Sequence, residues 1–395
     1  MLDLLAGLRV IDLTTIVLGP LATRILADQG AEVIKVEAPG GDLARSAGAP
    51  GPGGMGALFA ANNRNKRSVV LDLKSTGGRE ALEWLLGSAD ALVHNMRPAA
   101  AARLGLAPEA LSARHPRLVH CAAPGFGSAG PDADRPAYDD IIQAASGLAG
   151  LPLESGGTPA YAPTILADKL GALHVAQAVT AALLRRERSG AGAALELPMF
   201  EALVAFLFNE HLGAATWAED GAPGYARVLD PARRPYATAD GWVAILPYNA
   251  THWRRMLEEI GRADVCAAPW FADAGARNRR AGELYALLAA ATPARSTAAW
   301  CAACARLDVP HAKVARLAEL LEDPQLAAQG FFAADDGLEG RVRSVASPLR
   351  LGGAAGGRHM PPPALGADTA AVLRGLGYAE EEIARLMSGR GAGGA

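Results

Sequence analysis

The chain has 395 residues, of which 50% are hydrophobic and 20% charged, so it is long enough for roughly two or three globular domains. A net charge of -3 gives no general attraction to nucleic acid, and four cysteines are too few for a disulfide framework at this size. Apolar runs fall short of the roughly 20 residues of a membrane span, and charges break the N-terminal one, so we expect a cytoplasmic protein.

Strand-like and helical patterns alternate through the first 125 residues. The apolar stretch 8–13 predicts a strand, Pro20 opens a helix that runs to about residue 29, and 31–37 predicts a second strand. Further strands are predicted at 68–73, 91–93 and 118–122. This alternation favours an α/β fold with an open, doubly wound parallel sheet, which binds ligands beyond the carboxyl ends of its strands.

The first strand does not lead into the glycine fingerprint of dinucleotide-binding enzymes. It is followed by "TTIVLGPLATRI" in place of G-x-G-x-x-G, which argues against a nicotinamide cofactor. Two long loops rich in glycine and proline, 40–56 and 124–136, have the length that usually indicates function or mobility.

The chain is expected to contain two domains and a returning C-terminal segment. We assign 1–220 to a large domain and 235–314 to a small α+β domain, which opens with a hairpin whose turn is Asp240-Gly241. Residues 317–395 hold short helices and are expected to pack back on the large domain.

One carboxylate stands near the start of a long apolar helix. Pro163 and Thr164 indicate the helix start, and apolar residues then recur at helical spacing to Leu184, which places Asp168 in or just after the first turn. There the helix dipole and unpaired N–H groups favour an ionised carboxylate at neutral pH, as a nucleophile requires. Acidic residues are also common in first turns as plain dipole partners, so this segment alone leaves both readings open.

Seven segments, taken in order, resemble the family III CoA-transferases, the CaiB/BaiF group. They include "VIDLTTIVLGPLATRILADQGAEVIKVE", "NRNKRSVVLDLK", "HNMRPAAAARLGL", "HCAAPGFGSAGP", "PAYDDIIQAASGLAGL" and the Asp168 helix. That group includes formyl-CoA transferase and, more distantly, α-methylacyl-CoA racemases. The resemblance implies a Rossmann-like large domain, a smaller α+β domain and an interlocked homodimer, with coenzyme A and acyl-CoA as substrates and no tightly bound cofactor.

The resemblance also implies roles for individual residues. Asp168 matches the position of the family's nucleophile. The implied CoA-contact positions are Val17, Leu18, Leu71 to Lys74, Asn95, Met96, Arg97, Arg103 and Ala137 to Asp139. Arg45 matches a further motif and could meet a phosphate. Ala38 stands where formyl-CoA transferase has an arginine that helps to bind CoA, so phosphate binding could shift to Arg45 or Arg67.

The same fold supports transferases and racemases, and the segment "PAYDDIIQ" separates them. The racemases resembling this chain carry a His-Asp pair there, whereas this chain has Tyr138 followed by Asp139, as the transferases do. Tyrosine, with a reference pKa near 10, is a poor general base at neutral pH. We therefore expect CoA transfer to a carboxylic acid through adducts of Asp168, with Tyr138 and Asp139 as further catalytic residues. An acyl-CoA racemase or epimerase, or a catalytically silent CoA-binding protein, is the alternative.

The small domain has "LPYNATHW" (246–253) where formyl-CoA transferase has a glycine-rich loop. Tyr248, Asn249 and His252 could contact substrate, or the segment could be a hairpin exit and helix cap. The histidines lack metal-ligand spacing, so no metal site is expected. The acid and the acyl donor are not evident from one sequence.

Overall fold

The computed structural model describes residues 2–337, 340–355 and 359–388, and the chain forms two compact units. Unit 1 comprises Met1–Leu148, Tyr161–Phe206 and Gln325–Ala395, and unit 2 comprises Ala149–Ala160 and Leu207–Pro324. Within the described residues, no helix combines the length and the apolar character needed to cross a lipid bilayer.

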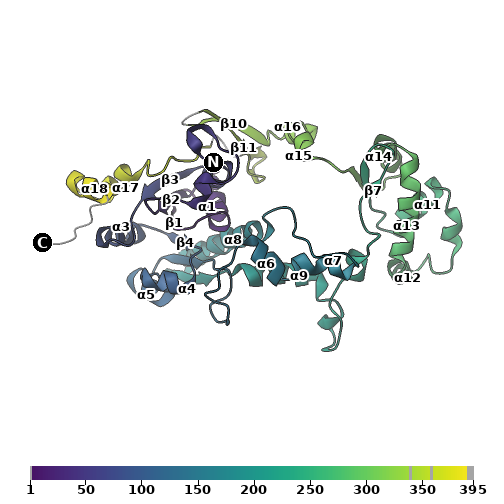
Figure 1. Ribbon diagram of the computed structural model, residues 1–395, viewed down its shortest axis with the longest axis horizontal. Helices are drawn as coiled ribbons and strands as arrows, with labels where there is room; N and C mark the ends of the chain where they lie inside the picture. Colours follow the sequence, from purple (N-terminus) through teal and green to yellow (C-terminus); the bar gives the residue numbers. More distant parts are fainter. Residues whose placement is uncertain (1, 338–339, 356–358, 389–395) are drawn as a thin grey trace. The chain divides into compact units, whose positions relative to one another are not determined.

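Unit 1 is built on a six-stranded parallel sheet (Figure 1). The strands are β1 (Arg9–Asp12), β2 (Glu32–Glu37), β3 (Lys66–Val70), β4 (Ala91–His94), β5 (Val119–Ala122) and β6 (Ala193–Glu196). Their order in space is β3-β2-β1-β4-β5-β6, the order of a doubly wound sheet that reverses direction beside its first strand. The predicted α/β fold with a parallel sheet is therefore confirmed.

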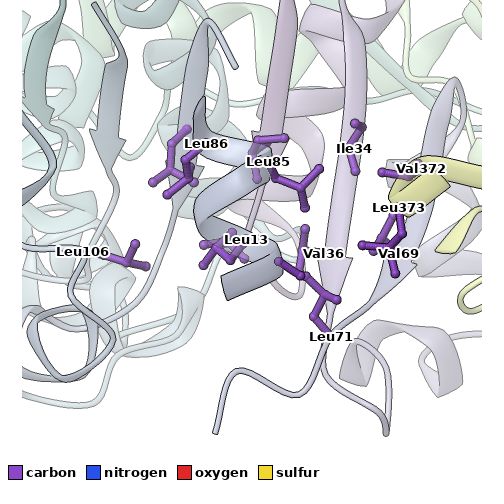
Figure 2. Packing of buried hydrophobic residues seen from close by; sticks show 14 of the residues in the cluster. Leu13, Ile34, Val36, Val69, Leu71, Leu85, Leu86, Leu106, Val372 and Leu373 are labelled. Carbon is purple, nitrogen blue, oxygen red and sulfur yellow. The ribbon is translucent and has the colours of Figure 1, made fainter. Parts of the chain in front are cut away.

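Helices cover both faces of this sheet. Those of unit 1 are α1 (Leu18–Asp28), α2 (Ala57–Asn63), α3 (Thr76–Gly87), α4 (Pro98–Arg103), α5 (Pro108–Arg114), α6 (Asp139–Ala145), α8 (Leu166–Ser189), α17 (Thr369–Gly375) and α18 (Glu380–Met387). The helices α9 (Met199–His211) and α16 (Pro324–Ala328) have residues in both units. On one face, leucines of α3 and residues of α17 pack on alternate residues of the central strands (Figure 2). On the other face, α1 lies against α8. Burial of apolar side chains on both faces explains why the strands read as continuous apolar runs.

The C-terminal part of the chain closes the β3 edge of the sheet. The N–H of Ser68 donates to Asp368 Oδ2 at 2.9 Å, and that of Val70 donates to Thr369 Oγ1 at 3.0 Å. The carbonyl of Ser68 accepts the N–H of Asp368 at 2.9 Å. Residues three hundred positions apart in the chain thus satisfy backbone groups that an edge strand would otherwise expose. Unit 1 also contains two short antiparallel pairs, β10 (Phe332–Gly337) with β11 (Gly340–Val345) and β12 (Arg350–Leu351) with β13 (Ala354–Ala355).

Unit 2 combines a small antiparallel sheet with helices. Its strands β7 (Tyr236–Ala237), β8 (Trp242–Ile245) and β9 (His311–Lys313) are paired in that order, and the predicted hairpin turn at Asp240-Gly241 joins the first two. Its helices are α7 (Leu151–Glu154), α10 (Ala226–Leu229), α11 (Ala250–Glu259), α12 (Ala274–Arg279), α13 (Ala281–Ala291), α14 (Thr297–Arg306) and α15 (Leu317–Leu320). Trp253, Tyr285 and Trp300 are buried in a core of its own.

Candidate active site

The carboxyl ends of the six parallel strands lie along one edge of the sheet, so the segments that follow them gather there. These segments are residues 13–17, 38–56, 71–75, 95–97 and 123–138. They carry most of the positions that the resemblance assigns to CoA.

The segment between β1 and α1 is held in an unusual backbone conformation. Ile16 has a φ of 72°, a left-handed value that costs a β-branched residue about 1–3 kcal/mol. Its N–H donates to both carboxylate oxygens of Asp42, at 3.1 and 3.3 Å. Lys35 Nζ lies 2.9 Å from Asp42 Oδ2 and donates to the Thr14 carbonyl at 2.8 Å. The side chains of Lys35 and Asp42 are fully buried, so this ion pair keeps the strained turn in place.

Four of the predicted CoA contacts have apolar side chains that pack inward. Val17, Leu18 and Leu71 are buried, and Met96 packs against the core on the α3 face. A Cβ on Gly171 would lie 2.6 Å from Leu18 Cδ1, which shows how closely α8 approaches the start of α1. The side chains of these residues belong to the core, so any contact with CoA would come through their backbone atoms.

Asn95 and Arg97 join neighbouring segments of this edge. Asn95 Oδ1 accepts the Thr15 N–H at 3.0 Å, and its Nδ2 donates to the Thr15 carbonyl at 2.9 Å. Arg97 Nη1 donates to the Asp134 carbonyl at 3.1 Å. The side-chain amide of Asn95 is therefore engaged with the β1–α1 segment, whereas the Arg97 guanidinium keeps free N–H groups.

Three predicted CoA-binding cations are exposed. Lys74 lies between β3 and α3, Arg97 precedes α4, and Arg103 ends that helix. Within the described part of the chain, none of the three forms an ion pair with a carboxylate. Their charges are available to a phosphate group.

Arg45 and Arg67 have partners within the protein. Arg45 binds Glu37 with two hydrogen bonds of 2.7 Å, donates to the Pro363 carbonyl at 3.1 Å and lies over the Phe59 ring. Arg67 pairs with Glu32 at 2.9 Å. Both guanidinium groups already neutralise carboxylates, so the exposed cations are the better candidates for phosphate.

Tyr138 immediately precedes α6, and its side chain is 63% exposed. The residue before it, Ala137, lies against the glycine-rich segment after β5: a Cβ on Gly125 would be 2.4 Å from the Ala137 Cβ. No hydrogen bond of the Tyr138 hydroxyl to another described residue is present. The hydroxyl is therefore open to a ligand.

Asp139 caps the helix that carries Asp168. Its Oδ1 accepts the N–H of Ala167 at 2.6 Å and that of Asp168 at 3.3 Å. Its Oδ2 accepts a hydrogen bond of 2.6 Å from Nε2 of Gln143, one turn further along α6. Both carboxylate oxygens of Asp139 are thus occupied, and the free N–H groups in the first turn of α8 are used by a residue from another helix.

Asp168 lies in the first turn of α8 and is 8% exposed. No side chain or backbone N–H among the described residues donates to its carboxylate oxygens. Burial, together with the nearby charge of Asp139, raises the pKa of Asp168 to about 7. The first-turn N–H groups that we expected to favour the ionised form are bonded to Asp139, so they do not offset the effect of burial on the pKa of Asp168.

The segment 246–253 forms the helix cap that was one of the two alternatives considered for it. Asn249 Oδ1 accepts the His252 N–H at 2.8 Å and caps α11, and His252 Nδ1 accepts the Tyr248 N–H at 3.3 Å. The Tyr248 side chain is exposed and lies near the Arg227 guanidinium. Asn249 and His252 are therefore helix-capping residues, while Tyr248 remains open to a ligand.

Two histidines that looked unrelated in the sequence form a buried pair. The Nε2 atoms of His94 and His120, on adjacent strands, are 2.9 Å apart. Burial lowers the pKa of His94 to about 3 and that of His120 to about 4, so both rings are neutral at pH 7. The Met96 N–H donates to His94 Nδ1 at 3.3 Å, so this pair supports the segment after β4. His94 directly follows one predicted strand and His120 lies in the next predicted strand along the chain, which is the signal that the sequence offers.

The six-stranded parallel sheet makes the chain an α/β protein, and Asp168 is a buried carboxylate within it. The sequence profile of CoA-transferase family III matches residues 5–369, and the chain belongs to this family. It is 32% identical over 389 residues to a succinate–glutarate CoA-transferase from Agrobacterium fabrum, covering 94% of this chain and 95% of that protein. It is 36% identical over 313 residues to a probable fatty acyl-CoA transferase from Mycobacterium tuberculosis, covering 75% and 78%.

Solved structures agree with this assignment. A CaiB/BaiF family protein from Brucella suis superimposes with a TM-score of 0.79 at 30% identity, covering 94% of this chain and 99% of that one. The family expected from the motifs is therefore confirmed, and the protein is a CoA-transferase enzyme.

The raised pKa of Asp168 predicts a stability gain for Asp168→Asn. In the unfolded chain Asp168 has the ordinary aspartate pKa near 4, whereas in the folded chain its pKa is about 7. As the pH rises from about 4 to 7, the unfolded chain ionises first, so the wild-type fold loses stability, and the loss is complete above pH 7. We expect the variant to be more stable than wild type by on the order of 2–4 kcal/mol at pH 8 and equally stable near pH 4, measured by denaturant unfolding. The matched change at an exposed carboxylate, Asp220→Asn, should have little effect at either pH. Equal stability of Asp168→Asn and wild type at pH 8 would contradict this.

Proposed function

We propose that the protein transfers CoA from an acyl-CoA donor to a carboxylic acid through covalent adducts on Asp168. The observation that carries this proposal is the state of that side chain. It is buried in the first turn of α8, accepts no hydrogen bond from the described residues and has a pKa of about 7. A carboxylate with a raised pKa that accepts no hydrogen bond is a better nucleophile than an ordinary surface aspartate.

Each step exchanges one bond for another. An Asp168 oxygen attacks the thioester carbonyl, the carbon–sulfur bond breaks, and CoA leaves as the thiolate with a mixed anhydride on the enzyme. The thiolate then attacks the aspartyl carbonyl of the anhydride, which releases the donor acid and leaves an aspartyl-CoA thioester. The acceptor carboxylate attacks the carbonyl of this thioester, which releases the CoA thiolate and forms a second mixed anhydride. The thiolate then attacks the acceptor's carbonyl in that anhydride, which yields the new acyl-CoA and frees the Asp168 carboxylate. The thioester energy passes through every intermediate, so no nucleotide is consumed.

Tyr138 and Asp139 differ in what they can contribute. The Tyr138 hydroxyl is exposed, and we assign it a contact with the reacting carbonyl or the CoA thiol. Asp139 has both oxygens occupied by the Ala167 and Asp168 N–H groups and by Gln143. We therefore assign it a positioning role, with no proton transfer of its own.

Covalent adducts on Asp168 are directly testable. With succinyl-CoA or acetyl-CoA, and succinate, glutarate or oxalate as acceptors, mass spectrometry of quenched enzyme should find an adduct on the peptide that contains Asp168. Because the ionised carboxylate is the nucleophile, kcat/KM should rise with pH to a plateau above about 7, and Asp168→Ala should lose transfer.

Full transfer activity in Asp168→Ala would overturn the proposal. Exchange of the α-hydrogen of an acyl-CoA with deuterium, without CoA reaching any added acid, would instead identify an acyl-CoA racemase. Asp220→Asn is the matched control, since it removes a carboxylate outside the site.

The exposed cations predict how CoA is held. We propose that Lys74 and Arg97 bind its phosphates, and Lys74→Ala and Arg97→Ala should each raise KM for acyl-CoA by roughly 10–100-fold, since each loses a bond between charged groups. Arg385→Ala, at an exposed arginine of α18, is the control. Acyl-dephospho-CoA lacks the 3′-phosphate. With this substrate, the alanine substitution of the residue that binds the 3′-phosphate should no longer raise KM, which identifies that residue. Unchanged KM in both variants would refute this assignment.

Exposed apolar side chains support an interlocked homodimer, the assembly that the resemblance implies. Leu173 and Leu184 on α8 and Phe206 and Phe208 on α9 are 40–59% exposed in the single chain. Large apolar side chains are seldom left in water in such numbers on neighbouring helices. Sedimentation equilibrium at micromolar concentration should give about twice the chain mass of 40.6 kDa, and a monomeric mass would exclude the dimer.

A further inference from the structure

Gln143 in α6 is fully buried, and both polar atoms of its side chain, Nε2 and Oε1, form hydrogen bonds. Its Nε2 donates to Asp139 Oδ2 at 2.6 Å and to the Thr164 carbonyl at 3.3 Å. Its Oε1 accepts the Ala162 N–H at 2.9 Å. One side chain therefore connects Asp139 to the segment that leads directly into α8.

The atoms bound by Gln143 determine where Asp139 and the start of α8 lie. Asp139 Oδ1 accepts the Ala167 and Asp168 N–H groups while its other oxygen accepts from Gln143. The segment 162–164, which sets the direction in which α8 begins, is bound through both its Ala162 N–H and its Thr164 carbonyl. A buried amide with three well-formed bonds is costly to displace.

Two carboxylates at the same helix start thus have opposite surroundings. Asp139 is saturated with donors, whereas Asp168 has none from the described residues. If Asp139 were free to move, the first-turn N–H groups would be left for Asp168 itself, and its carboxylate would turn toward the backbone and become less basic.

We propose that Gln143 is a positioning residue for acyl transfer: by holding Asp139 and the segment 162–164, it keeps the α8 cap on Asp139 and leaves the Asp168 carboxylate free to attack. This inference rests on the proposed function of Asp168. Lys169, next to Asp168 on α8, has its Nζ bonded to Thr164 Oγ1, and Asp140, next to Asp139 on α6, is exposed. α1, which packs on α8, presents the uncharged residue Leu18 there.

The first test is Gln143→Leu, which keeps a similar volume and removes all three bonds. We expect the rate of CoA release from saturating acyl-CoA to fall by roughly 10–100-fold, as for other residues that orient a reacting group, while KM for acyl-CoA changes little. The acid limb of the pH profile should move to lower pH, because Asp168 gains the N–H groups that Asp139 releases. Gln325→Leu, at an exposed glutamine, is the matched control.

A second test restores the hydrogen bond with exchanged partners and remains valid if Gln143→Leu folds poorly. In Asp139→Asn the new amide faces the Gln143 amide, so two donors oppose each other. In the double variant Asp139→Asn with Gln143→Glu, Asn donates to Glu, Asn Oδ1 still caps α8, and Glu still accepts the Ala162 N–H. The bond to the Thr164 carbonyl is not restored, because a carboxylate cannot donate. We therefore expect the double variant to recover part of the CoA-release rate lost in Asp139→Asn, which is the coupling expected of residues that act as a unit.

An unmoved acid limb and an unchanged CoA-release rate in Gln143→Leu, or a double variant no faster than Asp139→Asn, would overturn the inference. A merely structural role would lower the thermal midpoint without moving the acid limb. Failure of the proposed function is distinguished by Asp168→Ala: if that variant keeps full transfer activity, the role of Asp168 fails. If it is inactive while Gln143→Leu is unaffected, only the role of Gln143 fails.

Discussion

The site depends on one interaction, the capping of α8 by a carboxylate from α6. Asp139 accepts the Ala167 and Asp168 N–H groups, and this contact determines what Asp168 is able to do. A helix start normally stabilises an anion on its own first turn. Here that stabilisation is given to the neighbouring carboxylate, so Asp168 is left buried without a donor among the described residues. Burial and the nearby charge of Asp139 raise its pKa to about 7.

Buried ionic groups support the ligand-binding edge from beneath. Lys66 Nζ lies 2.9 Å from Asp12 Oδ2, and Lys35 binds Asp42 in the same way, with all four side chains out of contact with water. Burial lowers the pKa of Lys66 to about 8, and its position beside Asp12 keeps the pKa of that carboxyl well below its usual range. Such pairs contribute little net stability, but both partners must be present, because the loss of one leaves the other as an unpaired buried charge. They allow the Ile16 turn to keep a conformation that its side chain disfavours.

Local pattern predicted most of the large unit, and tertiary contacts account for what it missed. The strands of the sheet are short apolar runs between helices, and Asp168 lies in a first turn that starts at Leu166, close to the start inferred from Pro163 and Thr164. The sequence could not show that Asp139 takes the first-turn N–H groups, because Asp139 is 29 residues from Asp168 in the chain and on another helix. Likewise, nothing near Arg45 in sequence shows that Glu37 and the Phe59 ring engage its guanidinium. Residue spacing in the sequence identifies candidate site residues, whereas the hydrogen bonds and ion pairs of the folded chain determine their chemistry.

The closure of β3 by Asp368 and Thr369 makes the large unit depend on residues that are synthesised after the whole of unit 2. During translation, the whole of unit 2 is made before these two side chains appear, and until then the Ser68 and Val70 N–H groups of an edge strand have no partner in the C-terminal segment. Contacts across three hundred residues also close slowly, because the loop entropy is lost before the contact forms. A nascent chain of this protein therefore carries an open sheet edge for most of its synthesis, and a chain truncated before Asp368 carries it permanently.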